Sequence, residues 1–131
     1  MKFFVDNNIG HQFVDGMRGF TESLIGVTKI IHLKEKFNPN VKDVDWLRFA
    51  GENNYFVISK DNKMRYKPQE KKELSKNNIG AFIVRGKGSS SFDIIRVLVY
   101  KWPDIIEKAN HTKKPFIFSI NVKTKRIDKF S

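Results

Sequence analysis

Apolar residues along the chain fall into short continuous runs, separated by longer segments in which they recur every three or four positions. Continuous runs rich in aromatic and β-branched residues are typical of strands buried on both faces, as in parallel sheets. The tail after residue 122 is rich in lysine, which favours an edge strand or a frayed end. The pattern therefore predicts five strands, at residues 2–5, 28–33, 55–61, 81–84 and 115–122.

The segments between these runs carry helix signals. One apolar stripe after the first strand, with Asn7 or Asn8 as its N-cap, predicts a first helix; the stripe consists of Ile9, Phe13, Met17 and Phe20. A second helix is expected at residues 43–50 and a third from residue 68 until the closing segment 77–80. A fourth, capped by Ser90, should run through Phe92, Ile95, Val99 and Trp102, with Pro103 kinking or restarting it.

Strands that alternate with helices indicate βαβ units joined by right-handed crossovers. The expected fold class is α/β, a three-layer α/β/α sandwich with a mostly parallel central sheet. At 131 residues, the chain has about the size of one domain, and no internal linker or repeat divides it. We therefore expect a single domain spanning residues 1–131.

The composition adds a strong basic excess. The formal net charge is +11 and the sequence pI is near 9.9, which favours a polyanionic partner such as nucleic acid, although a lysine-rich proteome would explain the charge equally well. The absence of cysteine excludes disulfides and thiolate metal sites. No apolar run approaches the length of a membrane span, so we expect a soluble, cytoplasmic protein without a membrane partner.

Acidic residues follow two of the predicted strands and open one predicted helix. Asp6 and Asp61 end the strands, and Asp43 and Asp45 begin the helix. Because the carboxyl ends of parallel strands share one sheet edge, we expect Asp6, Asp43 and Asp61 to converge there. Clustered carboxylates repel one another, and a hard divalent cation removes that cost, so the pattern favours Mg²⁺ or Mn²⁺ that activates water against a phosphodiester. Asp45 is an additional candidate ligand.

Cations near these acids would hold a nucleic-acid backbone beside the reaction. The candidates are Lys60, Lys63, Arg65, Lys67, Arg85 and Lys87. Each acid also has an ordinary explanation: Asp43 and Asp45 suit the first turn of a helix, and Asp6 and Asp61 suit polar turns. Taken singly, the helix acids favour the structural explanation; taken together, the four favour a site.

Three segments give these acids a recognisable spacing: Phe4-Val5-Asp6-Asn7-Asn8-Ile9, Asp43-Val44-Asp45-Trp46-Leu47 and Val57-Ile58-Ser59-Lys60-Asp61. This arrangement resembles PIN-like domains, specifically the toxin branch related to VapC. The resemblance implies an α/β/α fold and an RNA-cleaving site in which Asp6, Asp43 and Asp61 bind Mg²⁺ or Mn²⁺. It also implies a cognate antitoxin protein as a partner, and a homodimer remains open.

The chain departs from the family pattern at a glutamate that many PIN domains carry on an early helix. Glu35 and Asp45 are the candidates for that position, yet surface exposure explains Glu35 and a first-turn helix acid explains Asp45. Two rivals to the nuclease remain. One is a catalytically silent module with the same fold that binds RNA or protein. The other is a receiver-like signalling domain, which would call for paired acids after the first strand and a lysine ending the last.

Overall fold

The computed structural model describes residues 1–20, 27, 29–61 and 68–130. The strands are β1 (Lys2–Val5), β2 (Lys29–His32), β3 (Tyr55–Asp61), β4 (Gly80–Arg85), β5 (Phe116–Asn121) and β6 (Ile127–Lys129). The helices are α1 (His11–Arg18), α2 (Asp43–Glu52), α3 (Pro68–Lys76), α4 (Ser91–Tyr100) and α5 (Trp102–His111), with a 3-10 turn, η2, at Leu33–Glu35.

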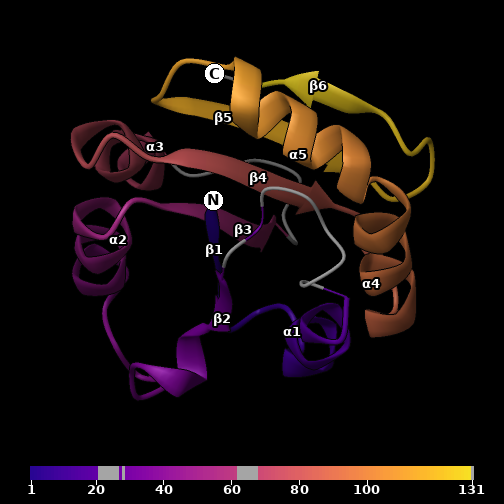
Figure 1. The fold of residues 1–131 in the computed structure, drawn as a ribbon, viewed down its shortest axis with the longest axis horizontal. Coiled ribbons are helices and arrows are strands. Elements are labelled where there is room, and N and C mark those ends of the chain that lie inside the picture. The colour runs from indigo at the N-terminus through magenta and orange to yellow at the C-terminus, as the bar shows by residue number, and fades with distance from the viewer. Residues whose placement is uncertain (21–26, 28, 62–67, 131) are drawn as a thin grey trace.

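The six strands form one sheet in the order β2-β1-β3-β4-β5-β6 (Figure 1). All neighbouring pairs are parallel except β5 and β6, which run antiparallel. The chain steps from β1 outward to β2 and then returns across β1 to β3. The winding direction therefore reverses between β1 and β3, and in open α/β sheets ligands bind outside the carboxyl ends of the strands at such a point.

Helices cover both faces of the sheet. The cluster on one face joins Phe3, Val5 and Ile58 to apolar residues of α1, α4 and α5. The cluster on the other face joins Phe4 and Val57 to residues of α2 and α3. Successive side chains of a strand point to opposite faces, so the continuous apolar runs supply both clusters. The predicted α/β/α sandwich with a mostly parallel sheet is confirmed, and the lysine-rich tail adds the antiparallel edge strand β6.

The first helix differs from its prediction. It begins after Gly10, whose backbone occupies the N-cap position without a side-chain cap, so Asn7 and Asn8 do not cap it. Phe13 and Met17 are buried as expected, but Phe20 follows the helix and is 54% exposed. The stripe therefore ends one turn earlier than the periodicity predicted.

The fourth helix begins where predicted, with the Ser90 hydroxyl accepting from the Asp93 backbone N–H. Its buried face consists of Ile94, Val97 and Leu98, whereas Phe92 and Val99, which helped to predict the helix, are exposed. Trp102 is buried but belongs to α5, which restarts beside Pro103. In the part of the chain that the structure describes, no helix is long and apolar enough to cross a membrane.

Candidate functional site

Asp6 and Ser59 meet at the reversal point between β1 and β3. The register pairs Val5 with Ile58, and the Asp6 N–H continues the ladder by donating to the Ile58 carbonyl at 2.9 Å. Asp6 is therefore level with Ser59, on the sheet face that α2 and α3 cover. The Ser59 hydroxyl donates to Asp6 Oδ2 at 2.8 Å. The buried serine thus fixes the orientation of the carboxylate.

The loop after Asp6 is held by both neighbouring strands. On the β3 side, the Asn8 amide donates to the Lys60 carbonyl at 2.7 Å and accepts from the Lys60 N–H at 3.2 Å. On the β2 side, the Ile9 carbonyl accepts from His32 Nε2 at 2.7 Å, because His32 Nδ1 already accepts from a backbone N–H. These contacts immobilise the segment that carries Asp6. They also give His32 a structural role, and burial lowers its pKa.

The surroundings of the Asp6 carboxyl oppose its ionisation. Burial raises its pKa, the hydrogen bonds from Ser59 and the Asn7 N–H act in the opposite direction, and the negative charge of Asp43 raises it further. The Asn7 N–H lies 2.6 Å from Asp6 Oδ1. Asp43 is thus near enough to Asp6 to act on its charge, although it comes from a different element. Two carboxylates therefore share one region at the carboxyl edge.

Asp43 reaches this region because of the tryptophan three residues later. Its Oδ1 accepts from Trp46 Nε1 at 3.0 Å within the first turn of α2. The Trp46 ring stacks on Phe4, with centroids 5.3 Å apart and planes at 6°. Phe4 lies two residues before Asp6 on the same face of β1. The Asp-x-x-Trp pattern therefore links the start of α2 to the strand that carries Asp6.

Asp61 lies on the same sheet face and at the same edge, but farther along its strand. β3 continues two residues beyond Ser59, which places Asp61 about 6.6 Å farther on at the usual rise per residue. There its Oδ2 lies 3.4 Å from the Arg85 guanidinium, and both side chains are largely buried. The ring of Phe130 also packs against Arg85, with its centroid 4.3 Å from Cζ. Asp61 thus has a cationic partner of its own.

The oxygen ligands at the edge suit a hard cation in their chemistry. Among the described residues Asp6 forms no ion pair, and the buried side-chain oxygen of the adjacent Asn7 has no hydrogen-bond partner there. A divalent cation would offset the repulsion between Asp6 and Asp43. Within the same described ranges, no three acidic or histidine side chains are grouped closely enough to form a metal site. The structure thus brings Asp6 and Asp43 together but not Asp61, which pairs with Arg85, and the binding of one cation by all three acids stays a prediction.

A cavity of about 410 Å³ adjoins Asp43 between α2 and α3. Glu70 and Glu73 of α3 line it together with Lys42 and Gln69. These glutamates were not predicted as site residues, because the polar positions of a charged helix such as α3 ordinarily face solvent. Their signal was the spacing of three, which places Glu70 and Glu73 on one helix face. They are the carboxylates that α3 contributes beside Asp43.

The other residues that the sequence predicted for the site do not all lie beside Asp6. Asp45 is exposed in the first turn of α2, and Glu35 forms an ion pair with Arg18. By strand alternation, Lys60 points to the sheet face opposite Asp6. Arg85 is paired with Asp61, and Lys87 is exposed after β4. The other predicted cations lie outside the described residues; these are Lys63, Arg65 and Lys67.

Comparison with known proteins agrees with this architecture. The family model described as "PIN like domain" matches residues 1–86, which include β1 to β4 and the segments carrying Asp6, Asp43 and Asp61. Neither the curated proteins nor the solved structures compared with the chain give a match. The matched residues make up more than half of the chain and contain its winding reversal and both of the neighbouring carboxylates. The chain belongs to the PIN-like domain family.

Proposed function

We propose that this chain is a Mg²⁺- or Mn²⁺-dependent ribonuclease. PIN domains are generally nucleases and typically use divalent metals. The observation that carries the proposal is the half-buried Asp6 carboxyl near Asp43 at the reversal of the sheet, with its pKa raised by burial and by that neighbouring charge. Asp43 itself is exposed, but repulsion between neighbouring carboxylates, one of them partly shielded from water, is costly unless a cation joins them.

The chain's own groups would act mainly by holding ligands in place. Asp6 and Asp43 would hold the cation, with Asp61 as the third predicted ligand. Ser59 orients Asp6, and Trp46 orients Asp43. When bound, the cation would supply positive charge to the phosphate and lower the pKa of a water molecule. Lys87, which is exposed after β4, would contact the RNA backbone near this edge together with the predicted cations Lys63, Arg65 and Lys67.

The motif spacing shared with VapC-related toxins supports a finer proposal, that the enzyme is the toxin of a toxin-antitoxin module and is neutralised by a protein antitoxin. The basic excess of the chain supports RNA as the substrate.

The Asp61–Arg85 ion pair favours a second candidate, a catalytically silent PIN-like module that binds RNA or protein. In this alternative Arg85 permanently neutralises the third acid, and too few ligands remain to hold a cation. The receiver-like alternative has less support, because the family model matches a PIN-like domain and β5 contains no lysine.

Cleavage of an unstructured RNA by the full chain tests the proposal. Asp6→Asn and Asp43→Asn should each lower the rate at least about 100-fold, beyond the 10- to 100-fold typical of outer partners of a metal site, and a chelator should abolish cleavage. Asp45→Asn is the matched control on the same helix and should retain activity.

Asp61→Asn separates the two candidates. If Asp61 is a ligand, this variant should lose cleavage together with Mn²⁺ affinity. Cleavage that resists chelation, or full activity in Asp6→Asn, would refute the metal mechanism. RNA binding without any cleavage by the unaltered chain would establish the silent module instead.

A further inference from the structure

Helix α4 is apolar on two faces. Ile94, Val97 and Leu98 are buried against the sheet, whereas Phe92 and Tyr100 are 71% and 64% exposed. Among the described residues, four large apolar side chains are exposed, and three of them belong to α4. The outer set recurs at helical spacing and so lies on one face of the helix; it consists of Phe92, Ile95, Val99 and Tyr100. We call this surface the α4 face.

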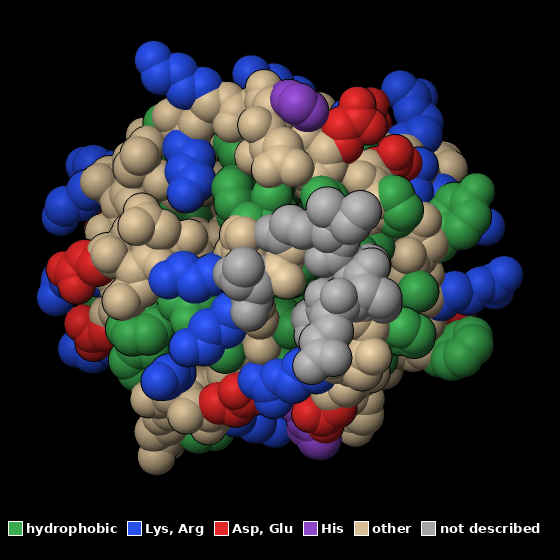
Figure 2. Space-filling view, in the orientation of Figure 1, with side chains coloured by type: hydrophobic (Ala, Val, Ile, Leu, Met, Phe, Trp, Pro, Cys, Tyr) green, Lys and Arg blue, Asp and Glu red, His purple; other side chains and the backbone are tan. Residues whose placement is uncertain are grey.

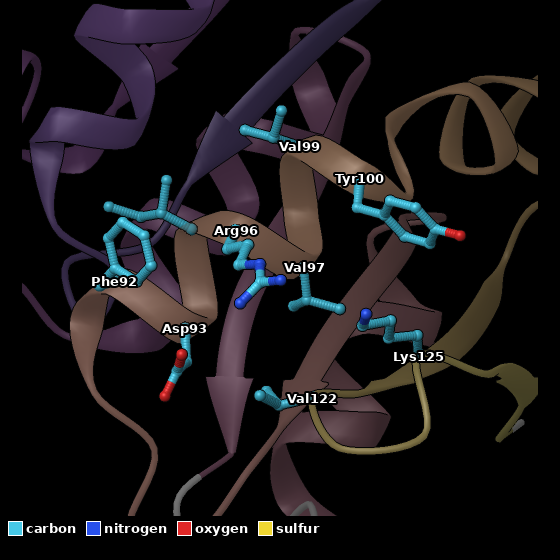
Figure 3. Close-up of a pocket in the computed structure, with 9 residues that line it drawn as sticks. Phe92, Asp93, Arg96, Val97, Val99, Tyr100, Val122 and Lys125 are labelled. Atoms are coloured by element: carbon cyan, nitrogen blue, oxygen red, sulfur yellow. The ribbon is translucent and has the colours of Figure 1, made fainter.

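The α4 face forms one wall of a cavity of about 520 Å³. The other wall is the turn between β5 and β6, which contributes Val122 and Lys125. Figure 3 shows Phe92 and Asp93 at one end, Arg96 in the middle, and Tyr100 and Lys125 at the other end. The α4 face therefore presents a groove with apolar sides and charged groups spaced along it.

The second wall is held in a defined shape. The Asn121 side chain accepts from the N–H groups of Lys123 and Thr124, each at 2.9 Å, and the Asn121 carbonyl accepts from the Lys125 N–H at 2.8 Å. Lys125 then projects its ammonium over the Tyr100 ring, 5.1 Å from the centroid. A groove whose wall is already ordered costs little conformational entropy when a ligand enters it.

The charges of the groove favour an acidic ligand. Its lining carries two cations, Arg96 and Lys125, and one carboxylate, Asp93. Lys101 adds a further ammonium near Tyr100, 5.7 Å from the ring centroid, although it is also paired with Asp104. The whole chain carries a formal charge of +11, so an acidic partner would be attracted over a longer range as well.

We propose that the α4 face binds an acidic amphipathic helix of another protein. The apolar side of that helix would pack on Phe92, Val99 and Tyr100, and its carboxylates would face Arg96 and Lys125. Docking an amphipathic helix into an apolar groove is a recurring mode of recognition. The surface lies outside residues 1–86, the part matched by the PIN-like family model, and the inference does not depend on nuclease activity.

Other occupants fit the groove less well. A two-fold dimer would place Arg96 and Lys125 of both copies in one interface between molecules of the same charge. The C-terminal residues of the chain are engaged elsewhere, since Phe130 packs against the α2 and α3 side of the sheet. A lipid bilayer offers no protruding side chains to fill a concave site.

Fluorescence anisotropy with two designed peptides tests the proposal. One peptide is an amphipathic helix with leucines on one face and glutamates on the other, and the second carries lysines in place of the glutamates. The full chain should bind the acidic peptide at least 10-fold more tightly than the basic one. Phe92→Ser with Tyr100→Ser should weaken that binding at least 10-fold, and the thermal melting of this variant should be unchanged because both side chains are exposed.

Charge reversal provides the matched control. Arg96→Glu with Lys125→Glu should reverse the preference between the two peptides. Arg48→Glu with Lys76→Glu changes the net charge equally on the opposite layer of the molecule and should leave the preference unaltered. Equal effects of the two pairs would overturn the proposal, because binding would then follow net charge alone.

Two further outcomes would assign the groove to another occupant and overturn the proposal. The first is self-association of the unaltered chain, detected by light scattering and abolished by the Phe92 and Tyr100 substitutions. The second is binding to phosphatidylserine vesicles that depends on those two residues, without binding of the acidic peptide.

Discussion

Asp6 combines features that ordinarily oppose each other. Its carboxyl is largely buried and lies near a second acid, yet it is oriented by Ser59 and the Asn7 N–H, both of which favour the ionised form. Burial is the largest of these effects and raises the pKa. The folded chain therefore binds this proton more tightly than the unfolded chain does, and ionisation at neutral pH destabilises the fold.

Asp6→Asn should consequently stabilise the metal-free chain at pH 7, on the order of 1 kcal/mol, as is common for substitutions that remove a functional strain. Ionised Asp6 destabilises the unaltered chain. Because its pKa is raised on folding, this destabilisation is absent below the pKa of about 4 in the unfolded chain and develops as pH rises through the pKa of Asp6 in the folded chain. The extra stability of the Asp6→Asn variant over the unaltered chain should therefore vanish near pH 3.5. Urea unfolding in chelator at both pH values measures it, and a variant less stable than the unaltered chain at pH 7 would contradict the argument.

Helix α2 positions its acid through packing rather than through backbone alone. Trp46 is buried, stacks on Phe4 and donates to Asp43. Phe4, the strand residue on which α2 packs through Trp46, thus lies two positions before Asp6. Asp61 instead meets a cation on the neighbouring strand, Arg85.

Trp46→Phe keeps an aromatic ring on Phe4 but removes the hydrogen bond to Asp43. We expect a loss of about 1 kcal/mol in stability and a 10- to 100-fold weaker affinity for Mn²⁺, as for other outer partners of metal ligands. Isothermal titration with Mn²⁺ measures the affinity.

Trp102→Phe is the matched control for this substitution. Trp102 is also buried, but its Nε1 has no hydrogen-bond partner among the described residues. The Trp102→Phe substitution should therefore leave the Mn²⁺ affinity unchanged. An equal loss in both variants would show that core packing, rather than the orientation of Asp43, controls the metal.

Positive charge is spread over the whole molecule. Lys2 and Lys114 lie at the amino edge of the sheet, over the rings of Tyr55 and Phe56, whereas Lys87 follows β4 at the carboxyl edge. Figure 2 likewise shows Lys and Arg side chains over much of one face, interspersed with Asp and Glu. Net charge alone therefore indicates an anionic partner without locating its binding surface.

Salt dependence can locate that surface. RNA affinity should fall with salt, and each phosphate contact removed should reduce the slope by about 0.7 for single strands. Lys87→Gln should lower the slope by this amount, whereas Lys29→Gln, an exposed residue at the start of β2, should not change it. Equal changes in the two titrations would mean that RNA does not prefer the carboxyl edge.

Local patterns in the sequence predicted much of this architecture. Residues 55–61 form a strand with the predicted limits because an apolar run bounded by polar residues has few alternatives. The exposed face of α4 was missed because Phe92 and Val99 have the same spacing as a buried stripe. Periodicity identifies an apolar face but does not say whether the sheet or solvent lies against it.

The candidate site shows the same division between local and long-range information. The contact from Asp43 to Trp46 is set by helical spacing within four consecutive residues. The pairing of Asp61 with Arg85 depends on β4 lying beside β3 in one particular register, which no local pattern determines. Sequence therefore predicted which sheet edge carries the acids but not the partner of each one.

The two outermost strands give the sheet a further property. β2 has 4 residues and begins at an exposed lysine, and β6 has 3 residues with Asp128 and Lys129 exposed. Short, charged margins offer a foreign strand little backbone to pair with. Although many phenylalanines lie in its interior, the folded chain is thereby discouraged from pairing edge to edge with other copies into cross-β fibrils.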